Sequence, residues 1–195
     1  MRVLSYIILA VGMIISLSIS KVKNENCIAV GPGGFSGFWH SYAVLSNLNY
    51  TGEYLCASSG CLSIVSKDIP FDTLYNIARY SNKTTLSNSR RLFIDNLVKK
   101  IDVIPDIKIV TMNKYASCLF RKPKNKRELR TLLYITTDVP FIFDGLSNEF
   151  DGFICYFIMN KCKKTINMPI KYRFVKKILS SNINPKDLEY FYNYR

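Results

Sequence analysis

Apolar and polar positions along the chain change period several times, and the changes predict strands alternating with helices. Residues 28–30, and residues 53–57 after the initial Glu53, form short apolar runs that predict buried strands. Between them, apolar side chains recur every three or four residues from Phe38 to Leu48, which predicts a helix with one buried face. Another helix is predicted from Ser59, directly after the second strand. The chain after residue 27 therefore begins as strand, helix, strand, helix.

The rest of the chain continues this alternation. Helical periodicity returns at residues 70–80, 87–101 and 126–135, with Ser87 as the expected N-cap of the second of these helices. Further strands are predicted at 108–112 and 116–120, forming a hairpin around Asn113 and Lys114, and at 153–159. A last helix is predicted from Asn184 and Pro185 to about Tyr194. The order predicts an α/β layered fold whose central sheet is mainly parallel.

The N-terminal segment has a different pattern. An apolar run from Val3 to Ile19 follows Arg2 and is followed by lysines, which is typical of a signal peptide or a signal anchor over residues 1–23. The run is also near the length that spans a bilayer, about 20 residues, so cleavage stays open. A buried helix of the fold is the weaker alternative because the run has no amphipathic period. Residues 24–195 then form one domain, in the secretory pathway or associated with a membrane.

Charge adds a preference for anionic partners. Lys and Arg number 27 against 14 Asp and Glu, a formal net charge of +13, which favours phospholipid headgroups or nucleic acid without choosing between them. The densest basic stretch consists of Arg121, Lys122, Lys124, Lys126, Arg127 and Arg130. It could rest on a membrane or nucleic acid surface, and a solvated loop leading into a helix explains it equally well.

Cysteine usage argues against a metal site. The six cysteines match no zinc-binding spacing, and the chain has only one histidine, so no metal is expected. A secretory start permits disulfides between them. Asn49 and Asn82 begin glycosylation sequons, which matter only if the body is lumenal.

The candidate chemistry starts at residues 56–60, CASSG, between a predicted strand and a predicted helix. The motif G-x-S-x-G of a nucleophile elbow is changed there only at its first glycine, so Ser58 is the candidate nucleophile. The turn would expose its hydroxyl at a strand end, where the positive end of the next helix faces developing negative charge. Alone this match is weak, because a serine that only caps a helix is more common.

A glycine-rich loop at residues 31–37, GPGGFSG, strengthens the hypothesis. A strand followed by glycines and a helix N-terminus directs backbone N–H groups at an oxyanion. The alternative is a dinucleotide-binding fingerprint, G-x-G-x-x-G. That alternative fails on context, because an acidic residue should end the second strand, and Ala57 and Ser58 stand there instead.

Together these segments resemble the patatin-like phospholipases, especially their adiponutrin-like branch. The resemblance covers about residues 28–160 and rests on three segments in the family's order: IAVGPGGFSG at 28–37, CASSGCL at 56–62, and KNKREL at 124–129 followed by TTDVPF at 136–141. It implies a three-layer α/β/α fold and a Ser/Asp dyad without cofactor. It also implies an oxyanion hole from the N–H groups of Gly33, Gly34 and Ser59, and a phospholipid or neutral acylglycerol substrate at a membrane surface.

The second dyad residue departs from the family pattern. Counting from Pro140 places the catalytic triplet on residues 157–159, FIM, and leaves the dyad without its aspartate. A shift of register would bring Asp151, or less readily Asp144, to the serine, so Asp151 is the candidate base. Each is followed by glycine, and Asp-Gly is also a common turn pair. Without a carboxylate the serine would be a poor nucleophile.

A triad would have to recruit His40, which lies on the predicted helix after the glycine loop. A histidine packed or solvated beside Trp39 is the favoured interpretation.

Three functions are compatible with these features. The first is a lipid acyl hydrolase, which requires an aspartate within hydrogen-bond reach of Ser58. The second is a catalytically inactive member of the fold that binds lipid, membrane or a protein partner, for which an aromatic residue should replace that aspartate. A nucleic-acid binder ranks last, because it explains the charge but neither the signal segment nor the glycine and serine motifs.

Overall fold

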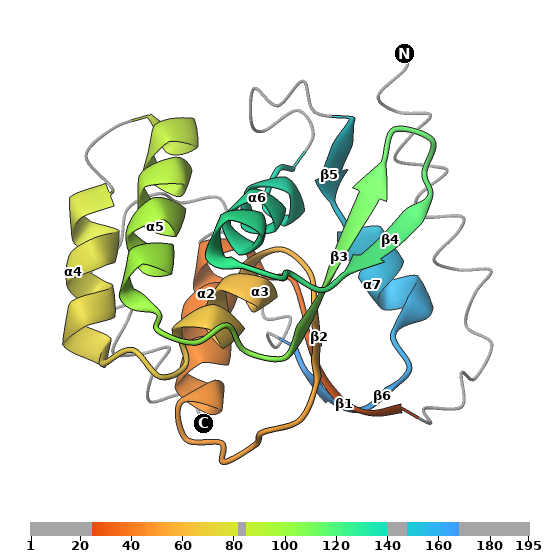
Figure 1. The fold of residues 1–195 in the computed structure, drawn as a ribbon, viewed down its shortest axis with the longest axis horizontal. Helices are drawn as coiled ribbons and strands as arrows, with labels where there is room; N and C mark the ends of the chain where they lie inside the picture. The colour runs from red at the N-terminus through yellow and green to blue at the C-terminus, as the bar shows by residue number, and fades with distance from the viewer. Residues whose placement is uncertain (1–24, 82–84, 140–147, 168–195) are drawn as a thin grey trace.

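The computed structural model describes residues 25–81, 85–139 and 148–167 (Figure 1). The predicted N-terminal signal or anchor, the predicted last helix, the sequon at Asn82, and Asp144 lie outside these ranges. No helix within the described ranges is long and apolar enough to cross a membrane.

Strands and helices alternate through the described residues. The strands are β1 (Glu25–Val30), β2 (Tyr54–Cys56), β3 (Ile107–Asn113), β4 (Cys118–Arg121), β5 (Glu149–Asp151) and β6 (Cys162–Ile166). The helices are α2 (Gly34–Leu45), α3 (Ser59–Ser66), α4 (Phe71–Ser81), α5 (Leu86–Lys100), α6 (Lys126–Thr136) and α7 (Phe153–Met159). The predicted hairpin of β3 and β4 is confirmed, with the Asn113 side chain accepting hydrogen bonds from two N–H groups of its turn.

The chain folds into a mixed α/β structure around a six-stranded, mostly parallel sheet. Its strand order is β4-β3-β2-β1-β6, and β5 pairs separately with β3. The pairs β3-β2, β2-β1 and β1-β6 are parallel, whereas β4 and β5 run antiparallel to β3. The predicted mainly parallel α/β class is therefore confirmed.

Alternate residues of the strands face two separate cores. On β1, Ile28 and Val30 join a large apolar core, and Cys27 and Ala29 join a smaller one on the other face. Helices α2 to α6 contribute to the large core, and α7 contributes Cys155 and Tyr156 to the smaller core. In Figure 1, α7 accordingly lies on the opposite side of the sheet from α2 and α3.

Two local predictions were wrong. Residues 153–159 form helix α7 rather than a strand. Their uninterrupted apolar run carries no period that separates a short strand from a short helix, and in the structure Phe157 and Met159 are exposed while Tyr156 is buried. The N-cap of α5 is Thr85 rather than Ser87, since the Thr85 hydroxyl accepts the N–H of Asn88 at 3.5 Å.

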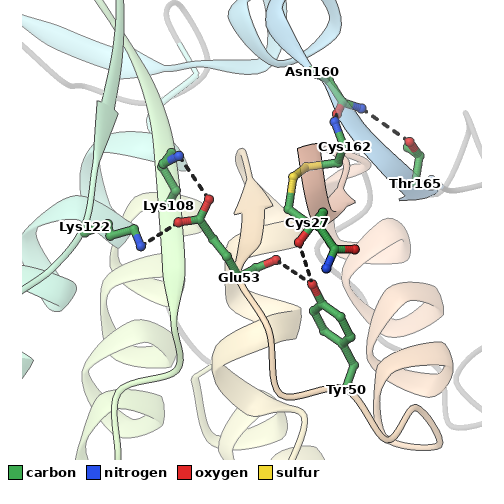
Figure 2. The surroundings of a disulfide bond; sticks show 9 residues. Cys27, Tyr50, Glu53, Lys108, Lys122, Asn160, Cys162 and Thr165 are labelled. Carbon is green, nitrogen blue, oxygen red and sulfur yellow. Dashed lines mark hydrogen bonds and ion pairs between the residues drawn. A yellow bond between two sulfur atoms is a disulfide. The ribbon is translucent and has the colours of Figure 1, made fainter. Parts of the chain in front are cut away.

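The edge of the sheet where the parallel strands begin is tied by a disulfide and by ion pairs. Figure 2 shows Cys27 of β1 bonded to Cys162 of β6, close to Tyr50 and Glu53. The Glu53 carboxylate pairs with Lys108, 3.0 Å away, and also with Lys122. These contacts hold the end of the sheet opposite to the one that carries the candidate site.

The predicted basic stretch runs from the last residue of β4 through a short loop into the first turns of α6. The side chain of Asn125 caps this helix by accepting the N–H of Glu128 at 2.9 Å. Three cations of the stretch have acidic partners: Arg121 pairs with Glu149, Lys122 with Glu53 and Asp106, and Arg130 with Asp95. Half of its positive charge is therefore balanced within the protein.

Candidate active site

Ser58 stands at a sharp turn between strand β2 and helix α3. Its backbone has φ 54° and ψ −134°, in the region that a residue with a side chain rarely adopts. Such a conformation costs of order 1–3 kcal/mol and persists only where the surroundings enforce it. The strand, sharp turn and helix predicted from the sequence are therefore present, with Ser58 in the strained position of a nucleophile elbow.

Hydrogen bonds from a distant helix hold this turn. The Ser58 N–H donates to Thr136 Oγ1, at the end of α6, over 2.9 Å. The Thr136 hydroxyl donates in turn to the carbonyl of Val110 on β3, also over 2.9 Å. Thr136 is fully buried, so it satisfies two polar groups of the sheet edge that water does not reach.

Gly60 lets the turn approach the strand beside it. A Cβ at this position would lie 2.3 Å from the carbonyl oxygen of Val30 and 2.6 Å from that of Gly31. Any side chain would therefore push α3 away from the end of β1. This close approach brings the first turn of α3 against the glycine-rich loop.

A disulfide spans the same turn. Cys56, the last residue of β2, is bonded to Cys61 in the first turn of α3, and their Cα atoms are 5.1 Å apart. Both cysteines are fully buried. The residue that replaces the first glycine of the elbow motif therefore joins the strand covalently to the helix.

Asp151 lies against Ser58. It ends β5, where it pairs with Thr111 of β3, and only 1% of its surface is exposed. Its carboxyl accepts the N–H of Phe153 at 3.0 Å, and the Ser58 side chain lies near enough to lower its pKa. The structure thus brings together the two residues proposed as nucleophile and base.

Burial raises the pKa of Asp151 to about 7. The Ser58 side chain, the hydrogen bond from the Phe153 N–H and the positive charge of Arg90 oppose this rise, and the nearby Asp138 adds to it. A carboxyl whose pKa is close to neutral can both accept and return a proton in that range. Gly152, next in the chain, lets the backbone pass close to β3, because a Cβ there would lie 2.5 Å from the Val110 carbonyl oxygen.

A buried ion pair lies behind the aspartate. Asp138 accepts the N–H of Asp151 at its own carbonyl, over 2.9 Å, and its carboxylate lies 3.6 Å from Arg90 Nη2. Arg90, on α5, also donates to the Tyr134 carbonyl and to Thr137 Oγ1. Asp138, in the segment that follows α6, therefore connects the backbone of Asp151 to the Arg90 guanidinium.

The candidate oxyanion donors sit at two helix starts. Gly33 is the N-cap of α2 and Gly34 its first residue, while Ser59 is the first residue of α3. The N–H groups of a first helical turn have no acceptor within an α-helix. In α3, the N–H groups of Gly60 and Cys61 donate to the carbonyls of Ala57 and Ser58, respectively. Ser59 precedes these two residues and follows the candidate nucleophile directly.

Two other candidates, His40 and Phe157, lie on helices α2 and α7. His40 is 9% exposed in α2, its Nδ1 has no hydrogen-bond partner among the described residues, and burial lowers its pKa. It is a packed helix residue, as favoured from the sequence. Phe157, where counting from Pro140 places the catalytic triplet, is 55% exposed on α7. The described residues include no group of three side chains suited to a metal ion.

Comparison of the chain with protein-family models and with curated proteins finds no match. The site is therefore interpreted from its own geometry.

Sequence reasoning did not assign a role to Thr136 or to Arg90. Thr136 and Asp138 lie in the segment TTDVPF, which carried part of the family resemblance, so a signal for their importance was present. Arg90 gave no such signal. It lies in a helix with several other polar residues, and only the packing of α5 on α6 brings it to the site.

Proposed function

We propose that this protein is a serine acyl hydrolase of the patatin-like type, with Ser58 as nucleophile and Asp151 as general base. The observation that carries the proposal is the nearness of the Ser58 side chain to the buried carboxyl of Asp151, whose pKa it lowers, at a turn with φ 54°. The strand, elbow and helix around Ser58 and the glycine-rich start of α2 support it. We extend the proposal to the three-layer α/β/α arrangement of that family, in which α7 belongs to the layer on the second face of the sheet.

The reaction would proceed in two steps. Ser58 Oγ attacks the carbonyl carbon of an ester while its proton passes to the Asp151 carboxylate, and the collapse of the tetrahedral intermediate expels the alcohol, which takes up that proton. Water then attacks the acyl-serine, losing its proton to Asp151, and the fatty acid leaves as Ser58 recovers its proton. A buried carboxyl with a pKa near 7 suits a group that gains and loses a proton in each cycle.

Negative charge appears on the ester oxygen in both steps. The N–H groups of Gly33, Gly34 and Ser59 are the proposed donors to this oxyanion. Removing one such donor from a hydrolase commonly lowers kcat by about 10²–10³. No cofactor takes part in this scheme.

The proposed substrate is a phospholipid or a neutral acylglycerol at a membrane surface. The net charge of +13 supports an anionic surface as the place of action. Disulfides support a lumenal or extracellular position for the body, because all six cysteines are paired and such bonds persist in oxidising compartments. We therefore place the protein in the secretory pathway or at a membrane within it, and we do not propose nucleic acid as a partner.

The proposal is tested with the full chain, produced through a secretory pathway so that its disulfides form. A fluorophosphonate probe should label the wild-type protein at Ser58, and the protein should release fatty acid from phosphatidylcholine or triacylglycerol emulsions. Ser58→Ala should abolish labelling. Asp151→Asn should lower the labelling rate by about 10² or more, since no carboxylate then accepts the proton.

Asp144→Asn is the matched control for the base. It changes the other Asp-Gly pair of the same region and should label at the wild-type rate. Labelling lost in this variant and kept in Asp151→Asn would move the role of base to Asp144. A folded wild-type protein that neither labels nor hydrolyses lipid would overturn the proposal in favour of an inactive, lipid- or partner-binding protein.

A further inference from the structure

The three disulfides of the protein differ in what they join. Cys27–Cys162 connects two neighbouring strands at the edge where they begin, and Cys118–Cys155 connects β4 to α7. Cys56–Cys61 closes a loop of only five residue steps, and this loop contains Ser58. One covalent bond is thus placed directly around the proposed nucleophile.

The short loop restrains the turn strongly. Five residue steps of extended chain span roughly 17 Å. The disulfide instead holds the Cα atoms of Cys56 and Cys61 at 5.1 Å. The end of β2 and the first turn of α3 cannot separate while this bond exists.

The turn needs such a restraint because its central residue is strained. Ser58 has a positive φ without being glycine. A conformation of this kind relaxes when the surrounding structure loosens. Its N–H donates to Thr136 Oγ1, which lies on a different helix. The motif's usual first glycine, which allows close packing, is here Cys56.

We infer that the Cys56–Cys61 disulfide is a positioning device that holds Ser58 in its strained, reactive conformation. The two cysteines are positioning residues, because they act on the nucleophile through the backbone of the elbow. The effect on catalysis rests on the proposed function, whereas the effect on the elbow does not. Removal of the bond should therefore slow the chemical step more than it weakens substrate binding.

The test compares two double variants of the full chain. C56A/C61A removes the bond around Ser58, and C27A/C162A removes the strand-to-strand bond, which encloses 135 residue steps instead of five. Alanine avoids placing new polar groups at these buried positions. The longer loop makes C27A/C162A the variant with the greater loss of thermal stability, because disulfide stabilisation grows with loop length.

Hydrogen exchange read by mass spectrometry reports on the elbow directly. In C56A/C61A the amides of residues 57–62 should exchange about tenfold faster than in the wild-type protein, while those of β1 and β3 stay protected. In C27A/C162A the elbow should exchange at the wild-type rate. Elbow exchange equal to wild type in C56A/C61A would overturn the inference.

Kinetics then connect the elbow to the reaction. C56A/C61A should lose about tenfold or more in kcat and in fluorophosphonate labelling rate, with KM little changed, and C27A/C162A should keep both rates at temperatures where it is folded. Equal loss in both variants would indicate general destabilisation and overturn the inference. If C56A/C61A does not fold, Cys61→Ala alone breaks the bond while keeping the Cys56 side chain at the strand end.

The hydrolase proposal and the inference about the disulfide can be overturned independently of each other. A wild-type protein without labelling or turnover overturns the hydrolase assignment. The exchange measurement still decides whether the disulfide holds the elbow.

Discussion

Ionisation of the buried Asp151 carboxyl near neutral pH lowers the stability of the folded protein. Its pKa is raised to about 7 from its ordinary value of 3.8, so between these pH values the folded state binds a proton that the unfolded state has already released. Stability due to this group is fully present below the unfolded pKa and is lost as the pH rises to the folded one. This pKa difference corresponds to a loss of roughly 4 kcal/mol in the free energy of unfolding above pH 7.

Asp151→Asn should therefore be more stable than the wild-type protein at pH 8. The amide keeps the shape of the carboxyl and carries no charge into the buried site. Thermal unfolding should show the gain shrinking as the pH falls from 7 towards 4, where the wild-type carboxyl is protonated in the folded state. A stability difference that does not depend on pH would contradict the raised pKa.

The same carboxyl should govern activity. Asp151 accepts a proton only when it is ionised, so labelling and kcat/KM should increase with pH through an apparent pKa of about 7 and level off above it. Rates measured from pH 5 to 9 at constant ionic strength test this. A profile that is flat between pH 5 and 8 would mean that the base titrates lower than the buried Asp151 does.

At the scale of elements, the end of α6 supports the elbow that β2 and α3 form. Thr136→Val should remove the acceptor of the Ser58 N–H and the donor to the Val110 carbonyl without changing the side chain's shape. Two buried polar groups left without partners should lower the free energy of unfolding by roughly 2–4 kcal/mol. Urea unfolding measures this loss, and labelling of Ser58 should slow as well.

Thr131→Val is the matched control on the same helix. Thr131 is exposed, and its hydroxyl donates to the Arg127 carbonyl one turn earlier. Its replacement should change the free energy of unfolding by less than about 0.5 kcal/mol. A similar loss in both variants would mean that the threonine bonds at the elbow are of no special importance.

The elements that the sequence predicted well are those with a clear period or a local turn. Helices α2 to α6 and the hairpin of β3 and β4 follow from spacing that is visible within a few residues. Helix α7 does not, because all its residues are apolar and its direction is set by the Cys155 bond to Cys118 and by the packing of Tyr156. The prediction at residues 153–159 failed for that reason.

The residues of the candidate site also differ in how well the sequence predicts them. Ser58 and the glycine-rich loop could be found from the sequence, because each is a local strand, turn and helix signal. The position of Asp151 could only be guessed, since counting from Pro140 favoured a register with no aspartate. What brings Asp151 to Ser58 is the antiparallel pairing of β5 with β3, across about forty residues of chain, and no short motif encodes such a pairing.

At the scale of the whole molecule, the bond between Cys27 and Cys162 encloses most of the described chain in one covalent ring. Tyr115, at the turn between β3 and β4, is 76% exposed and follows Lys114. If trypsin cuts after Lys114, the two fragments are joined by this bond alone, because each of the other disulfides lies within one fragment. The nicked protein should then run as one band on a denaturing gel without reductant and as two with it, so damage to the chain would stay hidden until the ring is opened.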